Sequence, residues 1–354
     1  MALAPCFEQL PVKVMRIQPL PLVVLLAASA AGEVSAFEAT MRAAVVSAGT
    51  IQVRDVVRPV AGRGQVLVKI RYAGVNPADW KTAGGSADDP TAGAGSGVPN
   101  AGASPIPGFD GSGVIAALGR GVVGYKIGDP VIVWSQARGT YAQYVAVPAD
   151  TVARKPDSLS FAEAAGVAHA GLAAWNMLID LAKVRSGQSV LVLGGAGGVG
   201  SAAVQIAKNR GAHVIATASA RNADYLKALG ADTVLDYTAQ HFEDQLRNID
   251  IAINTVDLDN AYRALAVVRR GGYLLSSVGL PAAEQCAARG VICSGRTLTG
   301  TPFHLALKQI ADWSRAGRFK VNIDQIFELT DVLKAWQYSE GGHTRGKSVI
   351  RIGR

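Results

Sequence analysis

The sequence predicts an α/β protein with a β-rich first domain followed by a doubly wound parallel sheet. From Met41 to about Val147, short β-branched runs are punctuated by Gly and Pro, which is typical of strands joined by turns. From Ser189 onward, strand-like and helix-like segments alternate, which favours a parallel sheet covered by helices. A chain of 354 residues, 49% of them apolar and 18% charged, is long enough to bury two cores.

Short strands are expected throughout the first region. They are Arg42–Val46, Ile51–Val57, Gln65–Tyr72, Gly113–Ala117 and the runs that end at Val133 and Val147. Alternation along Gln65–Arg71 places Val66, Val68 and Ile70 on one face of a strand. Residues 82–105 are rich in Gly, Ala, Ser and Asp, which predicts a surface loop at the mouth of a site.

Helices are expected to lead from the first region into the second. Ser160 followed by Glu163 forms a capping box and predicts a helix through Ala170. A second helix, Leu172–Ala182, then leads to the parallel sheet. The later elements are strands at Val190–Leu193, His213–Thr217, Thr233–Asp236, Ile249–Asn254 and Tyr273–Val278, helices at Ala261–Arg269 and Phe303–Ala316, and a last strand at Ser348–Ile352, which is expected to rejoin the first domain.

A glycine-rich turn stands between the first strand and the first helix of the parallel sheet. Gly195, Gly197 and Gly200 satisfy G-x-G-x-x-G, a pattern that binds dinucleotides when it joins a strand to a helix. The cofactor's pyrophosphate is expected at the helix N-terminus, where free N–H groups and the helix dipole favour an anion. The residues expected to contact it are Gly195, Ala196, Gly197, Gly198, Val199 and Gly200.

The residues after the second parallel strand predict which dinucleotide binds. NAD enzymes usually place an acid there to hold the ribose 2′-hydroxyl, but residues 217–222 contain none. Arg221 can instead hold a 2′-phosphate with its planar fork, helped by Ser219 and Asn222. The sequence therefore predicts NADP(H). The alternative is that Arg221 is a solvent-exposed arginine with no ligand.

The basic residues do not form a nucleic-acid footprint. The formal charge is +8, yet Lys and Arg are scattered and the longest basic run is Arg269-Arg270. A diffuse positive field attracts anions such as NADPH. We therefore expect a small-molecule partner and no nucleic acid.

The three cysteines lack the spacing of a metal site or a disulfide framework. They are Cys6, Cys286 and Cys293, with no C-x-x-C and no Cys/His cluster. We expect Cys286 and Cys293 to be buried thiols.

Residues 1–40 differ from the rest of the chain and have two interpretations. Lys13 and Arg16 precede a short apolar run and small residues, which is the layout of a secretory signal peptide. Alternatively, Met41 is the true start, because Met41–Val46 begins the first strand. The protein is cytoplasmic on the second interpretation, and secreted, periplasmic or organellar if the segment is a genuine signal.

On the motifs given below, the chain resembles the medium-chain dehydrogenase/reductase superfamily. It is most similar to the zinc-independent quinone oxidoreductases (zeta-crystallin-like) and the NADPH-using enone reductases, over about residues 41–354. The motifs that carry the resemblance are Gly74–Lys81 (GVNPADWK), Pro107–Gly113 (PGFDGSG), Gly194–Gly200 (GGAGGVG), Leu229–Asp232 (LGAD) with Asp236-Tyr237, and Gly342–Lys347 (GHTRGK).

The resemblance implies an architecture and a zinc-free site. A GroES-like β domain would be built from residues 41–165 and 303–354, with a Rossmann NADP-binding domain at 166–302 and the active site between them. Zinc-dependent relatives carry Cys at or near Asn76, His-Glu where this chain has Phe109-Asp110, and four clustered Cys in the lobe that corresponds to the glycine-rich loop at 82–105. This sequence has none of those thiols, so neither catalytic nor structural zinc is expected.

The resemblance also implies roles for particular residues. Asn76 and Lys81 would face the nicotinamide ribose and the substrate carbonyl, with Asp79 and Tyr141 orienting them. The further cofactor contacts implied are Tyr237, Asn254, Ser277, Gly279, Arg345 and Lys347.

Together these features predict an NADPH-dependent oxidoreductase. It would deliver hydride to quinones or to the C=C bond of α,β-unsaturated carbonyls, as a homodimer or monomer. The alternative is a non-catalytic NADPH-binding protein of the same fold with a structural or regulatory role.

Overall fold

The structure is a computed structural model, which describes residues 39–47, 49–82, 105–295 and 300–353. The loop expected at 82–105 and the segment expected at 1–40 therefore lie almost entirely outside the described residues. Among the described residues, no helix combines the length and the apolar character that crossing a membrane requires.

A seven-stranded sheet forms the first region, with the strand order β14-β15-β3-β4-β5-β7 and with β6 paired to β3. Its strands are β3 (Gln65–Gly74), β4 (Asp110–Leu118), β5 (Pro130–Trp134), β6 (Tyr144–Pro148), β7 (Val152–Arg154), β14 (Ile323–Glu328) and β15 (Lys347–Arg351). A separate two-stranded sheet contains β1 (Thr40–Ser47) and β2 (Thr50–Val57).

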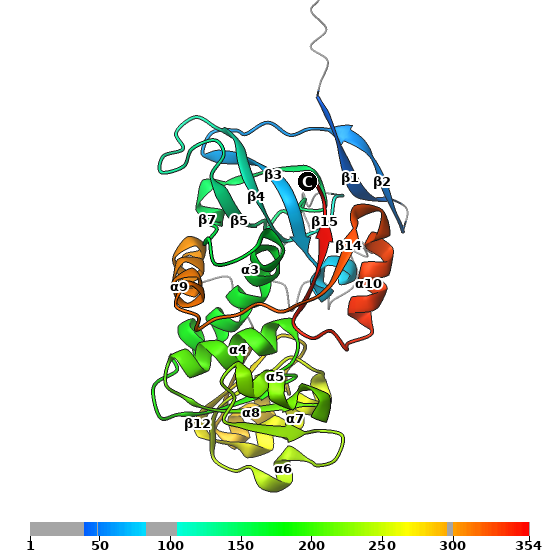
Figure 1. Ribbon diagram of the computed structural model, residues 1–354. Coiled ribbons are helices and arrows are strands. Elements are labelled where there is room, and N and C mark those ends of the chain that lie inside the picture. The colour runs from blue at the N-terminus through cyan, green and yellow to red at the C-terminus, as the bar shows by residue number, and fades with distance from the viewer. Residues whose placement is uncertain (1–38, 48, 83–104, 296–299, 354) are drawn as a thin grey trace, which may run out of the picture. The chain divides into compact units, whose positions relative to one another are not determined.

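The predicted alternation along β3 and the return of the last strand are both confirmed. Val66, Val68 and Ile70 are buried in one apolar cluster. β15 runs antiparallel to β3, with Ile350 opposite Ala73. Figure 1 shows β15, in red, beside β3, although the two strands come from opposite ends of the chain.

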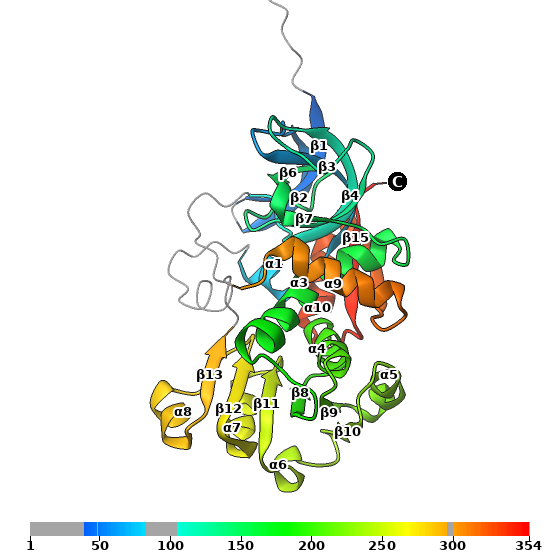
Figure 2. The same cartoon turned by 90° about the vertical axis from the view of Figure 1, so that its left-hand side faces the viewer.

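The second region is a six-stranded parallel sheet with the strand order β10-β9-β8-β11-β12-β13. This is the doubly wound order of a Rossmann fold. The strands are added in one direction from β8 to β10 and in the other direction from β11 to β13, so the switch point lies between β8 and β11. Figure 2 shows the strands side by side from β13 to β10. They are β8 (Ser189–Leu193), β9 (His213–Ala218), β10 (Thr233–Asp236), β11 (Ile249–Asn254), β12 (Val268–Ser276) and β13 (Ile292–Gly295).

Helices connect and cover the two sheets. The α-helices are α1 (Pro77–Lys81), α3 (Phe161–Trp175), α4 (Gly198–Asn209), α5 (Ala223–Ala228), α6 (Phe242–Gln245), α7 (Leu258–Val267), α8 (Ala283–Arg289), α9 (Phe303–Arg315) and α10 (Val332–Glu340). Short helical turns are η1 (Ala149–Thr151), η3 (Ala220–Asn222) and η4 (Leu329–Asp331).

The two helices predicted between the sheets are one continuous helix. The capping box at its start is confirmed. Ser160 Oγ accepts a hydrogen bond from the Glu163 N–H, and Glu163 Oε2 accepts one from the Ser160 N–H. α3 then passes through Gly171 and continues as the π-helical segment η2 (Asn176–Leu181). A Cβ at Gly171 would lie 3.1 Å from Ile310 of α9, so this glycine allows close helix packing and does not end the helix. The boundary proposed at 165/166 falls inside α3.

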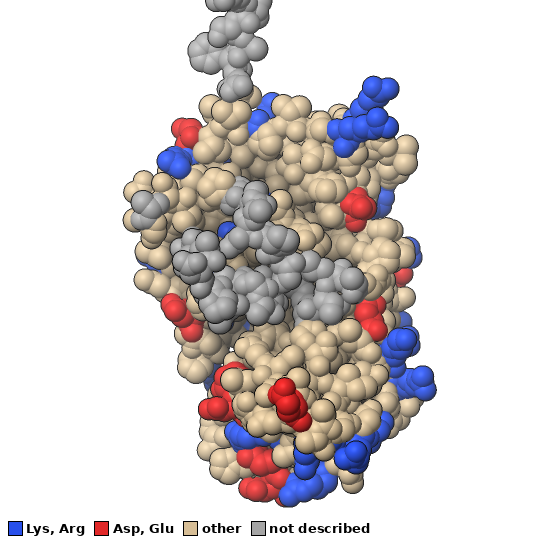
Figure 3. Space-filling view, turned by 180° about the vertical axis from the view of Figure 1, so that it is seen from behind, with Lys and Arg blue, Asp and Glu red and all other residues tan. Residues whose placement is uncertain are grey.

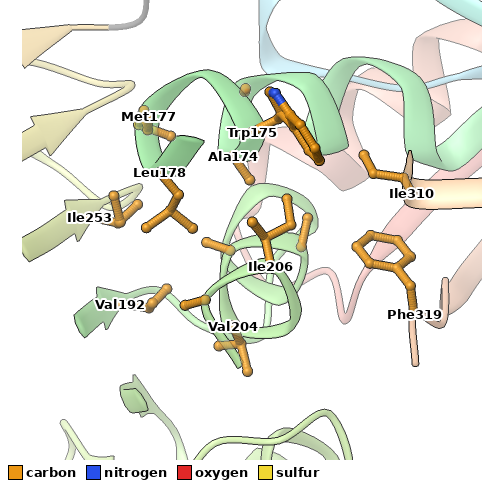
Figure 4. Packing of buried hydrophobic residues seen from close by; sticks show 14 of the residues in the cluster. Ala174, Trp175, Met177, Leu178, Val192, Val204, Ile206, Ile253, Ile310 and Phe319 are labelled. Atoms are coloured by element: carbon orange, nitrogen blue, oxygen red, sulfur yellow. The ribbon is translucent and has the colours of Figure 1, made fainter. Parts of the chain in front are cut away.

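An apolar core fixes α4 against α3 and α9. Figure 4 shows Ile206 of α4 beside Trp175, with Ile310 and Phe319 completing the contact. Ile206 and Val204 are fully buried, and each such side chain contributes roughly 1.5–3 kcal/mol. The position of the N-terminus of α4, at the glycine-rich turn, is therefore set by tertiary packing.

The expectation that Cys286 and Cys293 are separate thiols is wrong. They form a disulfide that joins α8 to β13. Gly290 follows α8 with a left-handed φ of 65°, which reverses the chain and brings the two Cα atoms to 6.0 Å. The sequence showed the residues, but it did not show this turn.

Candidate cofactor and active site

The glycine-rich turn between β8 and α4 contains glycines with different functions. A Cβ at Gly200 would lie 2.2 Å from the carbonyl oxygen of Gly194, so this position admits only glycine if the helix is to pack on the strand. A Cβ at Gly195 would come within 3.0 Å of Ala216. A Cβ at Gly197 would meet nothing closer than 3.6 Å, so the protein's own packing does not require glycine there.

The open space at Gly197 fits a pyrophosphate. Gly197 is the N-cap of α4, and the first helical N–H groups, from Gly198 onward, have no acceptor within the helix. Such groups and the helix dipole attract phosphate oxygens. The donors and the uncovered backbone are those that the diphosphate of a dinucleotide requires.

The end of β9 brings together the residues predicted to read the ribose. Arg221 is exposed in η3, and Asn222 Nδ2 lies 3.4 Å from Ser219 Oγ. Arg345, from the far end of the sequence, donates from Nε to Asn222 Oδ1 at 2.8 Å and from a terminal nitrogen to Arg221 O at 3.0 Å. Two guanidinium groups therefore lie at this turn.

β10 ends beside the same turn with an acid and an aromatic residue. Tyr237, predicted to flank the adenine, is 56% exposed, and its N–H donates to Ala218 O at 3.3 Å. Asp236 accepts both the N–H and the hydroxyl of Thr238. These bonds, with a further one from the Ala220 N–H, hold the pKa of Asp236 below its usual value. This carboxylate is engaged with protein donors.

The three residues predicted at the ends of β11 and β12 are placed differently from one another. Asn254 is fully buried, and its amide nitrogen donates to Asp257 O and to Ser276 Oγ. Both amide hydrogens of Asn254 are therefore used inside the protein. Ser277 and Gly279 are both half-buried and follow the end of β12, so these two lie at the accessible edge of the sheet.

The segment 345–347 joins the cofactor loop to the first sheet. Gly346 N donates to Ala196 O at 2.8 Å, and Gly346 forms a parallel bridge with Gly197. The next residue, Lys347, is buried, and its Nζ donates to Val75 O at 2.6 Å and to Asn76 Oδ1 at 2.5 Å. Consecutive residues thus contact the ribose turn, the glycine loop and Asn76.

The two residues predicted to be catalytic lie in different environments. Asn76 is buried as the N-cap of α1, where its N–H donates to Asp79 Oδ2 at 2.7 Å. Lys81, the last residue of α1, is exposed, and its ammonium lies 5.3 Å from the centre of the Trp80 ring. The structure therefore does not bring the Lys81 and Asn76 side chains into a hydrogen bond, whereas it joins Asn76 to Lys347.

The Asn76 amide is fixed by charged groups on both sides. Its oxygen faces the Lys347 ammonium, while its nitrogen donates to Asp110 Oδ1 at 2.7 Å and lies 3.4 Å from Asp79 Oδ2. Tyr141 completes the buried cluster by donating its hydroxyl hydrogen to Asp79 Oδ2 at 2.9 Å. Asp79 thus contacts Asn76 directly, and Tyr141 is linked to Asn76 through Asp79.

Burial shifts the ionisation of this cluster. Burial first, and the neighbouring Asp110 charge second, raise the pKa of Asp79 to about 7. Burial lowers the pKa of Lys347, against the opposing effects of Asp110 and Asp79. Burial and then the nearby Asp79 raise the pKa of Tyr141. Burial and the Asp110 charge thus outweigh the nearby Lys347 ammonium, which lowers the pKa of Asp79.

Asp110 is the member of this cluster to which sequence reasoning gave no role. It follows Phe109 in the Pro107–Gly113 motif and is completely buried at the start of β4. The available signal was a single acid in a glycine-rich motif, since acids that become buried are rarely unpaired. Among the described residues, no group of three or more His, Cys, Asp or Glu side chains is arranged to hold a metal ion.

A glycine loop at a helix N-terminus, at the switch point of a doubly wound sheet, defines a dinucleotide-binding protein. Comparison with family models agrees. The alcohol dehydrogenase GroES-like domain matches residues 62–157, the alanine dehydrogenase/PNT C-terminal domain matches 164–270, and the zinc-binding dehydrogenase model matches 229–350.

Proteins that are similar over most of the chain indicate a narrower group of enzymes. The chain is 35% identical to 2-methylene-furan-3-one reductase of Solanum lycopersicum and 31% identical to the chloroplastic NADPH-dependent alkenal/one oxidoreductase of Arabidopsis thaliana; each match covers 84% of this chain and 74% of the relative. The solved quinone oxidoreductase of Coxiella burnetii is 28% identical with a TM-score of 0.78, over 89% of this chain and all of that one.

The chain belongs to the medium-chain dehydrogenase/reductase superfamily, in the group of quinone oxidoreductases and enone reductases. It is an NAD(P)H-dependent oxidoreductase.

Proposed function

We propose that this protein is an NADPH-dependent reductase that delivers hydride to quinones or to the C=C bond of α,β-unsaturated carbonyls, without zinc. The observation that carries the proposal is the segment 345–347, which contacts the ribose turn, the glycine loop and Asn76 in succession. A cofactor bound along this segment would extend from Arg221 to the turn that contains Asn76.

The preference for NADPH rests on the arginines at the end of β9. Arg221 is exposed and Arg345 is half-buried beside Tyr225, so both guanidinium groups can reach a 2′-phosphate. The nearest acid at the end of a strand, Asp236, already accepts bonds from Thr238. A charge-assisted hydrogen bond contributes roughly 1.5–3 kcal/mol, enough for a tenfold preference or more.

The chain's own residues would bind the cofactor, orient the reacting atoms and stabilise the developing oxyanion. When bound, NADPH supplies the hydride, and quinones and enones are electrophilic enough at carbon to accept it without a Lewis acid. The glycine loop and the two arginines fix the cofactor, so that the reacting atoms meet in a defined geometry. Lys81, at the exposed end of α1, is proposed to donate to the developing oxyanion, and the final proton is assigned to water.

One observation supports a second candidate function. Both amide hydrogens of Asn76 are directed at the carboxylates of Asp110 and Asp79, so this amide has no N–H left for a substrate oxygen. A site in which the Asn76 amide offers no N–H to a substrate is also compatible with NADPH binding without turnover.

The deciding experiment is NADPH oxidation by the full chain at saturating cofactor. The acceptors would be a quinone, a 2-alkenal, a cyclic enone and a saturated aldehyde, with NADH in parallel and with metal analysis of the same sample. Turnover of the unsaturated acceptors by zinc-free enzyme, with NADPH preferred, is expected. Tight NADPH binding with no turnover of any acceptor would support the second candidate.

The surface charge supports a small-molecule partner. On the face shown in Figure 3, Lys and Arg side chains are interspersed with Asp and Glu over the half that holds the six-stranded sheet. We propose that nucleic acid is not a ligand. A filter-binding assay with duplex and single-stranded DNA is expected to show no retention at physiological salt.

We also propose a homodimer or monomer, because both outer strands of the parallel sheet offer an edge. β13 pairs with β12 on one side, and Ile292 on β13 is 49% exposed. Sedimentation at several concentrations would distinguish the two states and would detect any larger assembly.

For residues 1–40 we propose organellar import as the first possibility to test. One similar relative is named as chloroplastic. The mature protein from its source is expected to begin near residue 41 by N-terminal sequencing and to fractionate with an organelle. A mature chain that retains residues 1–40, or one that begins near residue 41 outside any organelle, would contradict this.

A further inference from the structure

Asp110 is held in place from two directions. Its Oδ1 accepts a hydrogen bond from Asn76 Nδ2 at 2.7 Å, and its Oδ2 accepts the backbone N–H of His169 in α3 at 2.9 Å. Gly74, on the neighbouring strand β3, leaves the space for this carboxylate, since a Cβ there would lie 2.5 Å from Asp110 Oδ1. The side chain therefore has one position, with one oxygen aimed at Asn76.

Lys347 is held with similar precision on the other side of Asn76. A Cβ at Gly198 would lie 2.6 Å from Lys347 Cδ, so this glycine, which is not part of the G-x-G-x-x-G pattern, lets the lysine stem pass the N-terminus of α4. Two of the three ammonium hydrogens are directed at Val75 O and Asn76 Oδ1. Within the described part of the chain, the third has no recorded acceptor.

We propose that Asp110 is a positioning residue, which through Asn76 holds the Lys347 ammonium beside the glycine loop, so that its remaining N–H binds the cofactor. The amide of Asn76 is suited to this task, because it joins a carboxylate to a cation through one rigid planar group. Asp110 itself contacts neither cofactor nor substrate. This inference rests on the proposed cofactor site, but it concerns binding and not turnover.

The charges around Lys347 determine how the arrangement responds to pH. The groups that face it or its partners are the carboxylates of Asp110 and Asp79, the phenol of Tyr141 beside Asp79, and the Arg138 guanidinium, which acts on Asp79. Burial lowers the pKa of Lys347, and Asp110 opposes this more than Asp79 does. Removal of the Asp110 charge would therefore lower the pKa of Lys347 further.

A double-mutant cycle on NADPH affinity tests the proposal. Lys347→Met keeps the stem and removes the charge, and is expected to raise the NADPH Kd roughly ten- to hundredfold. Asp110→Asn is expected to raise it severalfold. If Asp110 acts through Lys347, Asp110→Asn has no further effect in the Lys347→Met background. An equal effect of Asp110→Asn in both backgrounds, or no effect on Kd, would overturn the proposal.

The pH profile of binding separates positioning from a general structural effect. The affinity that depends on the ammonium is present below the pKa of Lys347 and is lost above it. The NADPH Kd of Asp110→Asn should therefore begin to rise at lower pH than that of the wild type, while Lys347→Met shows no such rise. Measurement in the Asp79→Asn background removes the titration of that neighbour. Superimposable profiles would contradict the proposal.

Two further variants keep the result interpretable. Asp129→Asn is the matched control, since Asp129 is also buried and forms an ion pair with Arg154 at 2.8 Å outside the cluster, and it should leave Kd unchanged. If Asp110→Asn does not fold, Gly198→Ala displaces Lys347 without altering Asp110. Because Gly198 also belongs to the glycine loop, the comparison is between backgrounds: Gly198→Ala should weaken NADPH binding more in the wild type than in Lys347→Ala, which lacks the clashing Cδ. Equal weakening in both backgrounds would refute the role of Lys347.

The outcome is independent of the proposed activity. A protein that binds NADPH but reduces no acceptor would defeat the proposed function and leave the cycle measurable. If the protein reduces the acceptors but the effects of Asp110→Asn and Lys347→Met on the NADPH Kd are additive, only the positioning role of Asp110 is refuted.

Discussion

Arg345 and Asn222 are joined by a hydrogen bond of 2.8 Å, although 123 positions separate them in the sequence. The same guanidinium also donates to Arg221 O, so a residue of the C-terminal segment holds the turn that follows β9. The ribose end of the cofactor site is therefore built jointly by the parallel sheet and the tail.

Arg221→Ala is expected to raise the NADPH dissociation constant severalfold without changing that of NADH. The exposed guanidinium would pair with the 2′-phosphate, which NADH lacks. Calorimetric titration of both cofactors measures the difference. Arg210→Ala, which removes an exposed arginine after α4, is the control; an equal loss for NADH would rule out a phosphate contact.

Gly197→Ala and Gly200→Ala are expected to fail in different ways. A methyl at Gly197 meets no protein atom closer than 3.6 Å, so the fold should persist while NADPH binding falls at least tenfold. A methyl at Gly200 would lie 2.2 Å from the Gly194 carbonyl and should destabilise the fold by several kcal/mol. Thermal unfolding and NADPH titration separate the two. A Gly197→Ala variant that binds normally would show that no pyrophosphate approaches this residue.

Lys81→Ala is expected to lower turnover roughly tenfold while leaving NADPH affinity nearly intact, because a donor to the developing charge acts mainly in the transition state. The exposed ammonium near the Trp80 ring is not needed for packing. Steady-state kinetics and cofactor titration measure the two quantities, with Lys81→Arg as the charge-conserving control. Parallel loss of binding and turnover would assign Lys81 to the cofactor instead.

Asp79 is expected to make the protein less stable as pH rises from about 4 to 7. Its pKa is about 7 in the folded state and about 3.9 when unfolded, so the folded state holds the proton more tightly. The stability this provides is complete below the unfolded pKa and is lost as pH rises through the folded one, by up to about 4 kcal/mol. Urea unfolding at pH 5 and 8 should show a smaller decline for Asp79→Asn. An identical decline would show that Asp79 does not titrate there.

Reduction of the Cys286–Cys293 disulfide is expected to destabilise the protein by about 2–3 kcal/mol, because the bridge restricts the unfolded chain around a short loop. Urea unfolding with and without dithiothreitol measures this. The double variant Cys286→Ser, Cys293→Ser should match the reduced protein and be insensitive to reductant. A reductant effect that persists in the double variant would exclude this bridge as its source.

Local features of the fold could be predicted from sequence because their causes are local. The capping box of Ser160 and Glu163 acts within one helical turn, and the glycine pattern at 195–200 sits between its own strand and helix. The prediction of two helices separated at Gly171 was wrong, because this glycine allows close packing against Ile310, which is far away in the chain.

The contacts of Asn76 with Asp110 and Lys347 could not be predicted, because these residues meet only through strand pairing. Asp110 lies 34 positions from Asn76, and Lys347 lies 271 positions from it. Nothing in the sequence states that β15 pairs with β3, which brings these groups together. The family resemblance assigned Lys347 to the cofactor, but it did not predict that Asp110 is linked to Lys347 through Asn76.

The place of β15 in the sheet has a consequence for synthesis on the ribosome. Its partner on β3, residues Tyr72–Gly74, is made early, whereas β15 is among the last segments to emerge. The parallel sheet of residues 189–295 can be completed while the nascent chain is still growing, but this part of β3 waits with an unpaired edge. Premature termination before Arg345 would therefore release a chain with an open strand edge and neither Arg345 nor Lys347, a species expected to aggregate or be degraded.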